Sequence, residues 1–160
     1  MRSFNLTACY LATVLTVAQA LAQPAENADV LLGTWKLDVS KSTYSGIEPP
    51  RELVETYREL ANGDIERTAT EIRADGSVRP AARVTWPRRG GVIKGVNRPG
   101  TFIQAYIGPG EWLVMTLLDS VQVSTRHKVV AADGRTMTQA YRGIDRNGNP
   151  ISSDQVWIRQ

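Results

Sequence analysis

The residues that most often carry chemistry are scarce in this sequence. His127 is the only histidine, and the only cysteine is Cys9, near the N-terminus. A zinc site needs several converging histidine, cysteine or carboxylate ligands, so we predict no metal site. A serine triad would have to use His127, yet the chain lacks the Gly-x-Ser-x-Gly turn that presents such a nucleophile. We therefore predict no catalytic residue and no cofactor, and we interpret His127 as a hydrogen-bonding residue in the wall of a binding site.

Carboxylates are the remaining candidates for acid–base chemistry. Glu55, Glu59, Glu66 and Glu71 fall in two neighbouring segments, and paired carboxylates hydrolyse glycosides when a fold fixes the distance between them. Nothing in the sequence fixes that distance. We interpret these glutamates as solvated faces of strands.

Aromatic side chains recur in many segments and are the strongest candidates for contacts with a ligand. They are Trp35, Tyr57, Trp86, Tyr106, Trp112, Tyr141 and Trp157. If these segments close into a barrel, the rings converge on one interior, which would be either a ligand cavity or a filled core. We predict that the ligand-binding residues are Tyr57, Trp86, Tyr106, His127, Tyr141 and Trp157.

The N-terminal residues have the pattern of a secretory signal peptide. Arg2 precedes a mostly apolar run over residues 8–21, and Ala20-Leu21-Ala22 fits a small-x-small cleavage site. We expect a signal peptide over residues 1–22, a tether over 23–30 and one domain over 31–160. The protein would then be periplasmic or secreted and, because the apolar run is short, would have no membrane anchor.

The charge of the chain argues against nucleic-acid partners. Nineteen Lys and Arg against 16 Asp and Glu give a formal net charge of +3, and the basic residues are scattered along the sequence. A nucleic-acid-binding surface needs a basic patch or stripe.

Turn signals divide the chain at regular intervals and predict an all-β domain. Pairs such as Asn62-Gly63, Asp75-Gly76 and Asp133-Gly134 favour tight hairpin turns. They separate ten segments of strand length: 31–39, 51–60, 64–73, 78–86, 91–96, 101–107, 111–118, 121–130, 136–144 and 152–159. An open meander of ten strands would expose long edges, so we predict an up-and-down antiparallel β-barrel without a helical lid.

Alternation of apolar and polar residues predicts which side chains face inward. In the segment 121–130 the apolar set is Val121, Val123, Thr125, His127 and Val129, which we place inside, with Gln122, Ser124, Arg126 and Lys128 outside. Segments 101–107 and 111–118 are apolar on both faces. Their outer face would need a cover, either the long connection over residues 40–50 or a second subunit in a homodimer.

The first predicted strand carries the motif Gly33-Thr34-Trp35-Lys36-Leu37. A Gly-x-Trp at this position resembles the lipocalin and fatty-acid-binding superfamily, the calycins. The run from Gly33 to Tyr44 and the turn Gly143-Ile144-Asp145-Arg146-Asn147-Gly148-Asn149-Pro150 are similar to those of small secreted bacterial lipocalin-like proteins of unknown function. The resemblance implies that an arginine near the end of the barrel packs on Trp35 as a cation–π contact, and Arg159 is the matching residue.

Two departures from the fatty-acid-binding branch limit what the resemblance implies. The segment 40–50 is too short and proline-rich for the two helices of that branch, and Gln155-Val156-Trp157 replaces its carboxylate-binding Arg-x-Tyr. Three hypotheses follow. The first is a binding protein that holds a small apolar or amphipathic molecule. The second is an interaction protein with a filled barrel and an apolar outer wall, and the third is a lipocalin-type enzyme acting on a lipophilic substrate.

Overall fold

A computed structural model describes residues 30–160, and all of its regular structure lies in one antiparallel sheet. The strands are β1 (Gly33–Ser45), β2 (Glu52–Glu59), β3 (Ile65–Ile72), β4 (Val78–Trp86), β5 (Gly90–Val92), β6 (Thr101–Gly108), β7 (Glu111–Leu118), β8 (Val121–Val130), β9 (Thr136–Ile144) and β10 (Pro150–Arg159). Residues 30–160 include no helix that could cross a bilayer. The predicted signal peptide lies outside the described residues and stays a prediction.

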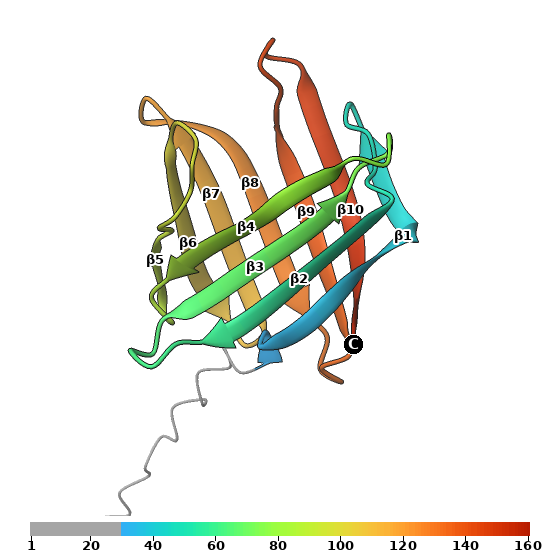
Figure 1. Cartoon of the computed structure of the whole chain (residues 1–160). Helices are drawn as coiled ribbons and strands as arrows, with labels where there is room; N and C mark the ends of the chain where they lie inside the picture. Colours follow the sequence, from blue (N-terminus) through green and yellow to red (C-terminus); the bar gives the residue numbers. More distant parts are fainter. Residues whose placement is uncertain (1–29) are drawn as a thin grey trace, which may run out of the picture.

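The sheet curls into a nearly closed barrel, which confirms the predicted fold class. Its strand order is β4-β3-β2-β1-β10-β9-β8-β7-β6-β5. Strands that follow one another along the chain are therefore neighbours, except β4 and β5, which form the two edges, and β1 also pairs with β10. In Figure 1 strands β2 to β4 cross in front of β7 to β10. The two edges of the sheet meet at one isolated bridge, in which Thr85 and Lys94 exchange backbone hydrogen bonds of 2.8 and 3.1 Å.

Strand β1 is longer than the sequence predicts. We expected it to end at residue 39, with a connection over 40–50, but it continues to Ser45 after an irregularity between Asp38 and Thr43. The Ser42 hydroxyl makes this possible, because it accepts a hydrogen bond from the Val156 backbone N–H at 3.0 Å. The polar run therefore serves as strand, and the connection to β2 shrinks to residues 46–51. This connection is too short to cover the outer face of β6 and β7, which was one of the two covers that we predicted.

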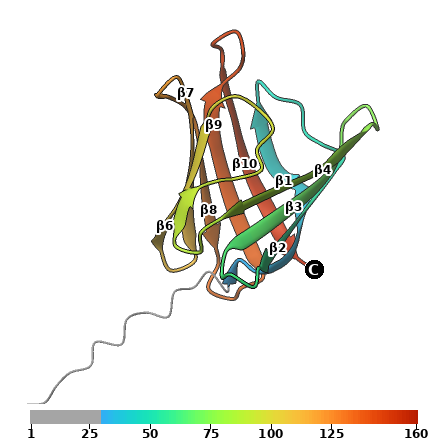
Figure 2. The same cartoon turned by 60° about the vertical axis from the view of Figure 1, so that its left-hand side comes forward.

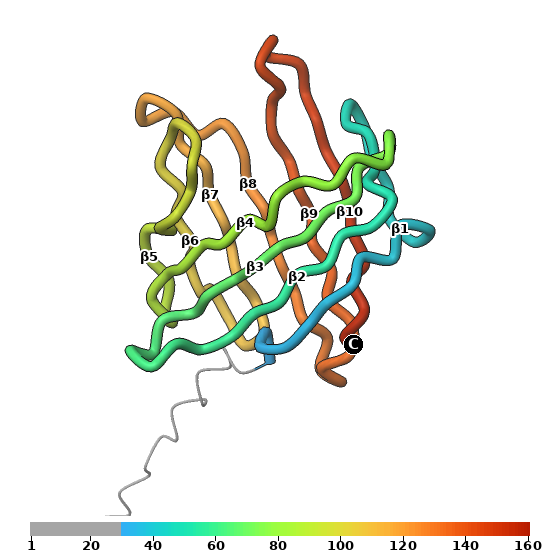
Figure 3. The backbone as a smooth tube through the Cα atoms, in the orientation of Figure 1, coloured from blue at the N-terminus to red at the C-terminus, as the bar shows by residue number. Residues whose placement is uncertain are grey.

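Strand β5 is shorter than predicted, and residues 93–100 form the longest connection between strands in the described chain. Figure 3 follows this segment as it leaves β5 and returns to β6. It is anchored at two glycines with positive φ. A Cβ on Gly95 would lie 2.9 Å from the Arg83 carbonyl oxygen, and a Cβ on Gly100 would lie 2.7 Å from that of Leu117. The segment thus lies against β4 at one end and β7 at the other.

One end of the barrel is filled by a buried apolar cluster. Its largest members are Trp35, Trp86, Trp112, Trp157 and Tyr57, all essentially inaccessible to solvent. The Trp35 indole N–H donates to the Leu31 carbonyl at 2.8 Å, so the residues before β1 close the cluster. The start of β1 and the end of β10 lie side by side at this end, where Figure 2 shows the C-terminus.

Arg159 joins the ends of the described chain at this sealed end. Its guanidinium carbon lies 4.3 Å from the centre of the Trp35 ring, which is the contact that the calycin resemblance implies. Its N–H groups donate to the carbonyls of Gly134, Leu32 and Val30. Gly33 has a φ of +118°, and a Cβ there would lie 2.7 Å from Arg159 Nη1. Glycine is required at this position because the guanidinium occupies the space of any side chain.

Candidate functional site

The inward face of β8 is the polar one, so our prediction for this strand was wrong. Lys128 is 1% exposed and donates to the Tyr57 hydroxyl at 2.6 Å across the barrel. Arg126 and Lys128 pair with the inward residues Val114 and Trp112 of β7. His127 points outward, its side chain is 41% exposed, and its Nε2 lies 2.6 Å from Glu111 Oε1. Thr125 and Val129 share that outer face, but the pairing with β7 shifts its register at Val123, so the alternation does not continue to Val121, which pairs with Leu118.

The charged face of β8 can point into the barrel because the carboxylate of Glu55 lies on the opposite wall. Glu55, on β2, is only 2% exposed, and an isolated buried carboxylate would be very costly. Arg67 of β3 lies 2.9 Å from Glu55 Oε1, and Lys128 Nζ lies 4.0 Å from Glu55 Oε2. If the other face of β8 pointed inward, Lys128 would no longer contact Glu55. In the observed orientation, the outward residues of β8 extend the outer wall formed by the outward residues of β6 and β7.

Tyr57 links the two charges of this buried network. Its hydroxyl donates to Glu55 Oε2 and accepts from Lys128 Nζ, and its ring also lies 4.9 Å from Nζ. Burial alone would raise the pKa of Glu55, but Arg67, Lys128 and the Tyr57 hydroxyl outweigh burial and lower it to about 2. Burial lowers the pKa of Lys128 to about 7, against the opposing effect of Glu55. The carboxylate is therefore charged at neutral pH, and the amine gives up its proton more readily than an exposed lysine.

Arg126 brings a further positive charge to the interior. It makes no ion pair with any carboxylate of the described chain, and its guanidinium carbon lies 5.5 Å from the centre of the Tyr141 ring. Burial, followed by the charge of Arg67, lowers the pKa of Arg126. Its Nε is buried and has no hydrogen-bond partner. A buried donor without an acceptor costs about 1–3 kcal/mol, so this N–H is suited to an acceptor supplied by a ligand.

Arg126 belongs to a continuous row of inward side chains on neighbouring strands. The register pairs Gln104 with Val114, Val114 with Arg126, Arg126 with Tyr141, and Tyr141 with Ser153. Neighbouring strands are about 4.8 Å apart, so the row forms a belt around half of the barrel. Gln104 Nε2 and Ser153 Oγ are also buried without partners. The belt thus presents several unsatisfied polar groups at one level of the interior.

The structure brings together some of the predicted ligand-binding residues. Tyr57 and Trp86 make an edge-to-face contact with ring centres 6.2 Å apart, and Tyr141 lies in the polar belt beneath Arg126. Tyr106 faces inward and contacts Trp112, with ring centres 5.9 Å apart. Trp157 is buried in the sealed end and pairs with Leu37 of β1. His127 is the exception, since it lies on the outer face.

The sequence analysis did not place four charged residues in the interior: it interpreted Glu55 as solvated, put Arg126 and Lys128 on the outer face, and did not consider Arg67. A usable signal was present in β2, where Glu55 shares a face with Leu53 and Tyr57. A carboxylate between two inward residues must be buried with a cation. Two strands contain candidate cations: β3, which is polar on both faces, and β8, where Arg126 and Lys128 alternate with less polar residues.

The outward position of His127 can be tested by stability measurements. His127→Ala is expected to change the free energy of unfolding by at most about 1 kcal/mol, because it removes one solvent-exposed pair with Glu111. Chemical denaturation at pH 7 measures this. A loss of several kcal/mol would mean that the imidazole is buried in the barrel and that β8 faces the other way.

The inward groups are suited to binding an anion rather than a metal ion. Residues 30–160 hold no group of three His, Cys, Asp or Glu side chains that could bind a metal ion. Around the belt the inward charges are Arg67, Arg126 and Lys128 against Glu55. Solvent reaches this region from the end opposite Arg159, since Ala82, which pairs with the inward Ala69, is exposed and the Arg67 side chain is 20% exposed.

A nearly closed ten-stranded antiparallel barrel, sealed at one end by a Gly-x-Trp motif and an arginine, is the fold of the calycins. The S-type phycobiliprotein lyase CPES from Guillardia theta superposes with a TM-score of 0.57 and 11% identity, over 82% of this chain and 89% of that chain. The fluorescent protein UnaG superposes with a TM-score of 0.52 and 9% identity, over 82% and 98%. No protein-family model matches the sequence, and no curated protein does.

Proposed function

We propose that the barrel binds a small amphipathic molecule through an anionic group. The observation that carries the proposal is the buried, unpartnered Arg126 Nε in an interior with more cations than anions. An anionic group beside Arg126 would supply the missing acceptor and offset the excess positive charge. Hydrogen bonds to charged groups contribute about 1.5–3 kcal/mol each, so this contact would have a large share of the affinity.

The surroundings of Arg126 favour a ligand with an apolar body. Tyr141 stacks beneath the guanidinium, and Phe102 and Val114 face the same interior from β6 and β7. Apolar and aromatic walls with a few convergent polar groups are typical of small-molecule sites. The cations on β8 and β3 take the place of the Arg-x-Tyr that is absent from β10, so the last strand need not supply the charge.

We favour binding over catalysis because the titratable groups of the interior already bond to one another. Tyr57 donates to Glu55 and accepts from Lys128, and Arg67 pairs with Glu55. His127 is on the outer face, where it cannot act on a molecule inside the barrel. These interior groups therefore stabilise one another, and Arg126 is left with a hydrogen-bond donor that a ligand could satisfy.

The fluorescent anion 8-anilinonaphthalene-1-sulfonate tests the proposal. We expect it to bind with enhanced fluorescence, and we expect Arg126→Met to raise its Kd by about 10- to 100-fold, the equivalent of one charged hydrogen bond. The variant should fold at least as well as the wild type, because it removes a buried charge without a carboxylate partner. Thermal unfolding checks this.

Arg142→Met is the matched control. Arg142 lies on β9 next to Tyr141, but it faces outward and pairs with Asp154 at 2.7 Å. Its loss should leave the Kd unchanged. Equal binding by the wild type and Arg126→Met, or no binding of the dye by the wild type, would refute an anion site in the barrel.

A further inference from the structure

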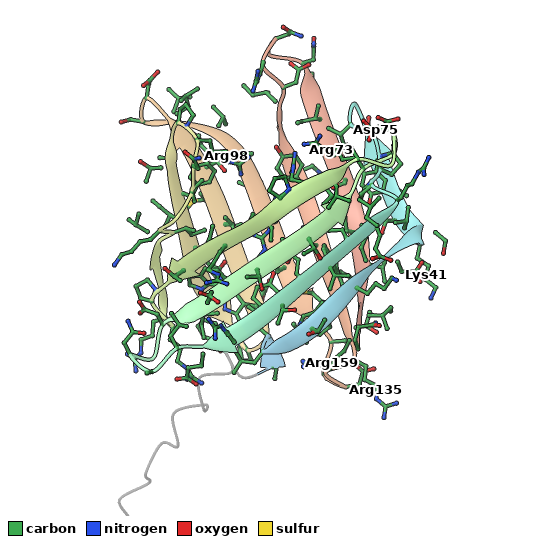
Figure 4. The ribbon with its side chains drawn as sticks, in the orientation of Figure 1. Lys41, Arg73, Asp75, Arg98, Arg135 and Arg159 are labelled. Carbon is green, nitrogen blue, oxygen red and sulfur yellow. The ribbon has the colours of Figure 1, made fainter. Side chains whose placement is uncertain are left out.

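A second arginine without a carboxylate partner lies at the open end of the barrel. Arg98 is in the segment 93–100, and Figure 4 shows it at the end opposite Arg159 and Arg135. Its guanidinium carbon lies 4.7 Å from the centre of the Phe102 ring. Phe102 is 6% exposed and pairs with Thr116 of β7, so the ring faces the interior. Arg98 therefore covers an inward-facing aromatic residue from above.

The position of Arg98 is defined by backbone contacts on both sides of it. Gly95 lies against the Arg83 carbonyl of β4, and Gly100 lies against the Leu117 carbonyl of β7. Both glycines have positive φ and approach backbone too closely for any side chain. The segment is thus held between β4 and β7, and the guanidinium lies over the ring of the inward-facing Phe102.

Arg98 and Arg126 stand at successive levels of the same wall. Phe102 is two residues before Gln104 on β6, and Gln104 lies in the row of Arg126. Two residues along a strand span about 6.6–6.8 Å. Arg98 over Phe102 is therefore about one level nearer to the open end than Arg126 over Tyr141. Residues 30–160 provide neither arginine with an ion pair to a carboxylate.

Arg98 is exposed to solvent, so an anion can reach its guanidinium from outside the barrel. Partial burial of the guanidinium lowers the pKa of Arg98, and although Tyr141 opposes this, the positive charges of Arg79 and Arg67 add to it. Arg79 already pairs with Glu71 at 2.9 Å, and Arg67 pairs with Glu55. The carboxylates of Glu55 and Glu71 are thus engaged, and an anion near Arg98 would have to come from a ligand.

We propose that the ligand carries two acidic groups, the inner one bound by Arg126 and the outer one by Arg98, with an apolar body between them against Tyr141 and Phe102. This inference rests on the proposed function and narrows it from an anionic amphiphile to a dianionic one. A ligand with one charge would satisfy Arg126 and leave Arg98 without an anion. The preference for two charges is therefore a property of Arg98 alone.

Two naphthalene probes that differ by one charge test the inference. Naphthalene-2,6-dicarboxylate has two carboxylates, and its monomethyl ester keeps the same rings with one carboxylate. Each is titrated against the bound 8-anilinonaphthalene-1-sulfonate by displacement at pH 8. We expect the dicarboxylate to bind the wild type at least tenfold more tightly than the ester.

Three variants locate the second charge. In Arg98→Met the preference should fall to about onefold while the affinity for the ester stays unchanged. In Arg126→Met both probes should bind more weakly. Arg146→Met is the control for general attraction of anions, because Arg146 is exposed in the turn after β9 at the same end. Its loss should leave the tenfold preference intact.

The outcomes separate this inference from the proposed function. If both naphthalene probes bind equally well to the wild type, or if Arg146→Met removes the preference as fully as Arg98→Met, the two-anion site is refuted and the single anion site stands. If neither the dye nor either probe binds the wild type, the proposed function fails, and this inference fails with it.

Discussion

Replacing Glu55 with glutamine is expected to lower the free energy of unfolding by about 3 kcal/mol at pH 7. The carboxylate is the only anion that contacts both Arg67 and Lys128 in the described structure. Removing one partner of a buried ion pair typically costs 3–5 kcal/mol, because the other charge stays buried without compensation. Lys128 can relieve part of this cost by releasing its proton, but Arg67 cannot. Chemical denaturation measures the difference.

The pH dependence of stability provides an independent test of the same group. The pKa of Glu55 is about 2 in the folded protein and near 4.5 when unfolded. Between these values the unfolded state binds more protons, so the folded state loses about 3 kcal/mol as the pH falls from 4.5 to 2. The Lys128 pKa is lowered from 10.5 to about 7, so its contribution has the same sign in a higher pH range: stability rises as the pH increases from 7 towards 10.5.

Glu55→Gln should remove the acid-dependent part of this profile. The wild type and the variant are then expected to differ most above pH 5 and to converge near pH 2. Glu59→Gln is the matched control on the same strand, because Glu59 is exposed and its pair with Arg88 lies at the surface. A constant difference between wild type and Glu55→Gln across pH 2–7 would show that Glu55 is not the group that titrates.

Replacing Trp35 with alanine is expected to lower the free energy of unfolding by about 3–5 kcal/mol, the usual cost of truncating a buried aromatic residue. Trp35 is fully inaccessible, its N–H donates to Leu31, and Arg159 lies over its ring. The truncation would leave a cavity in the sealed end and remove the surface on which the guanidinium packs. Denaturation followed by circular dichroism measures the loss.

Trp35→Phe divides this effect into its parts. Phenylalanine keeps a ring beneath Arg159 and most of the apolar volume, but it cannot donate to the Leu31 carbonyl. We expect the free energy of unfolding to fall by less than half as much in Trp35→Phe as in Trp35→Ala. Val121→Ala, at a residue that is 64% exposed, should cost less than about 0.5 kcal/mol. Equal losses for alanine at positions 35 and 121 would contradict a sealed core at this end.

The sequence by itself determined the type and order of the strands. Asx-Gly turns and alternation mark segments that agree with most observed strands, such as β7 and β8, because hairpin turns are specified by local backbone chemistry. Gly33-Thr34-Trp35 likewise indicated the sealed end, since it combines a residue that permits close approach with a large apolar ring. The fate of residues 40–45 could not be predicted, because Ser42 joins the sheet through Val156, more than a hundred residues away.

Only the tertiary structure decided which side of β8 faces inward, and with it the candidate site. Alternation shows that a strand has two different faces, but it does not state that the apolar one must be inside. The decision depends on Glu55, because a buried carboxylate makes an inward Lys128 favourable, and that pairing joins β2 to β8 across the barrel. The place of Arg98 is likewise a tertiary property, because it depends on contacts of residues 93–100 with β4 and β7 and on the Phe102 ring.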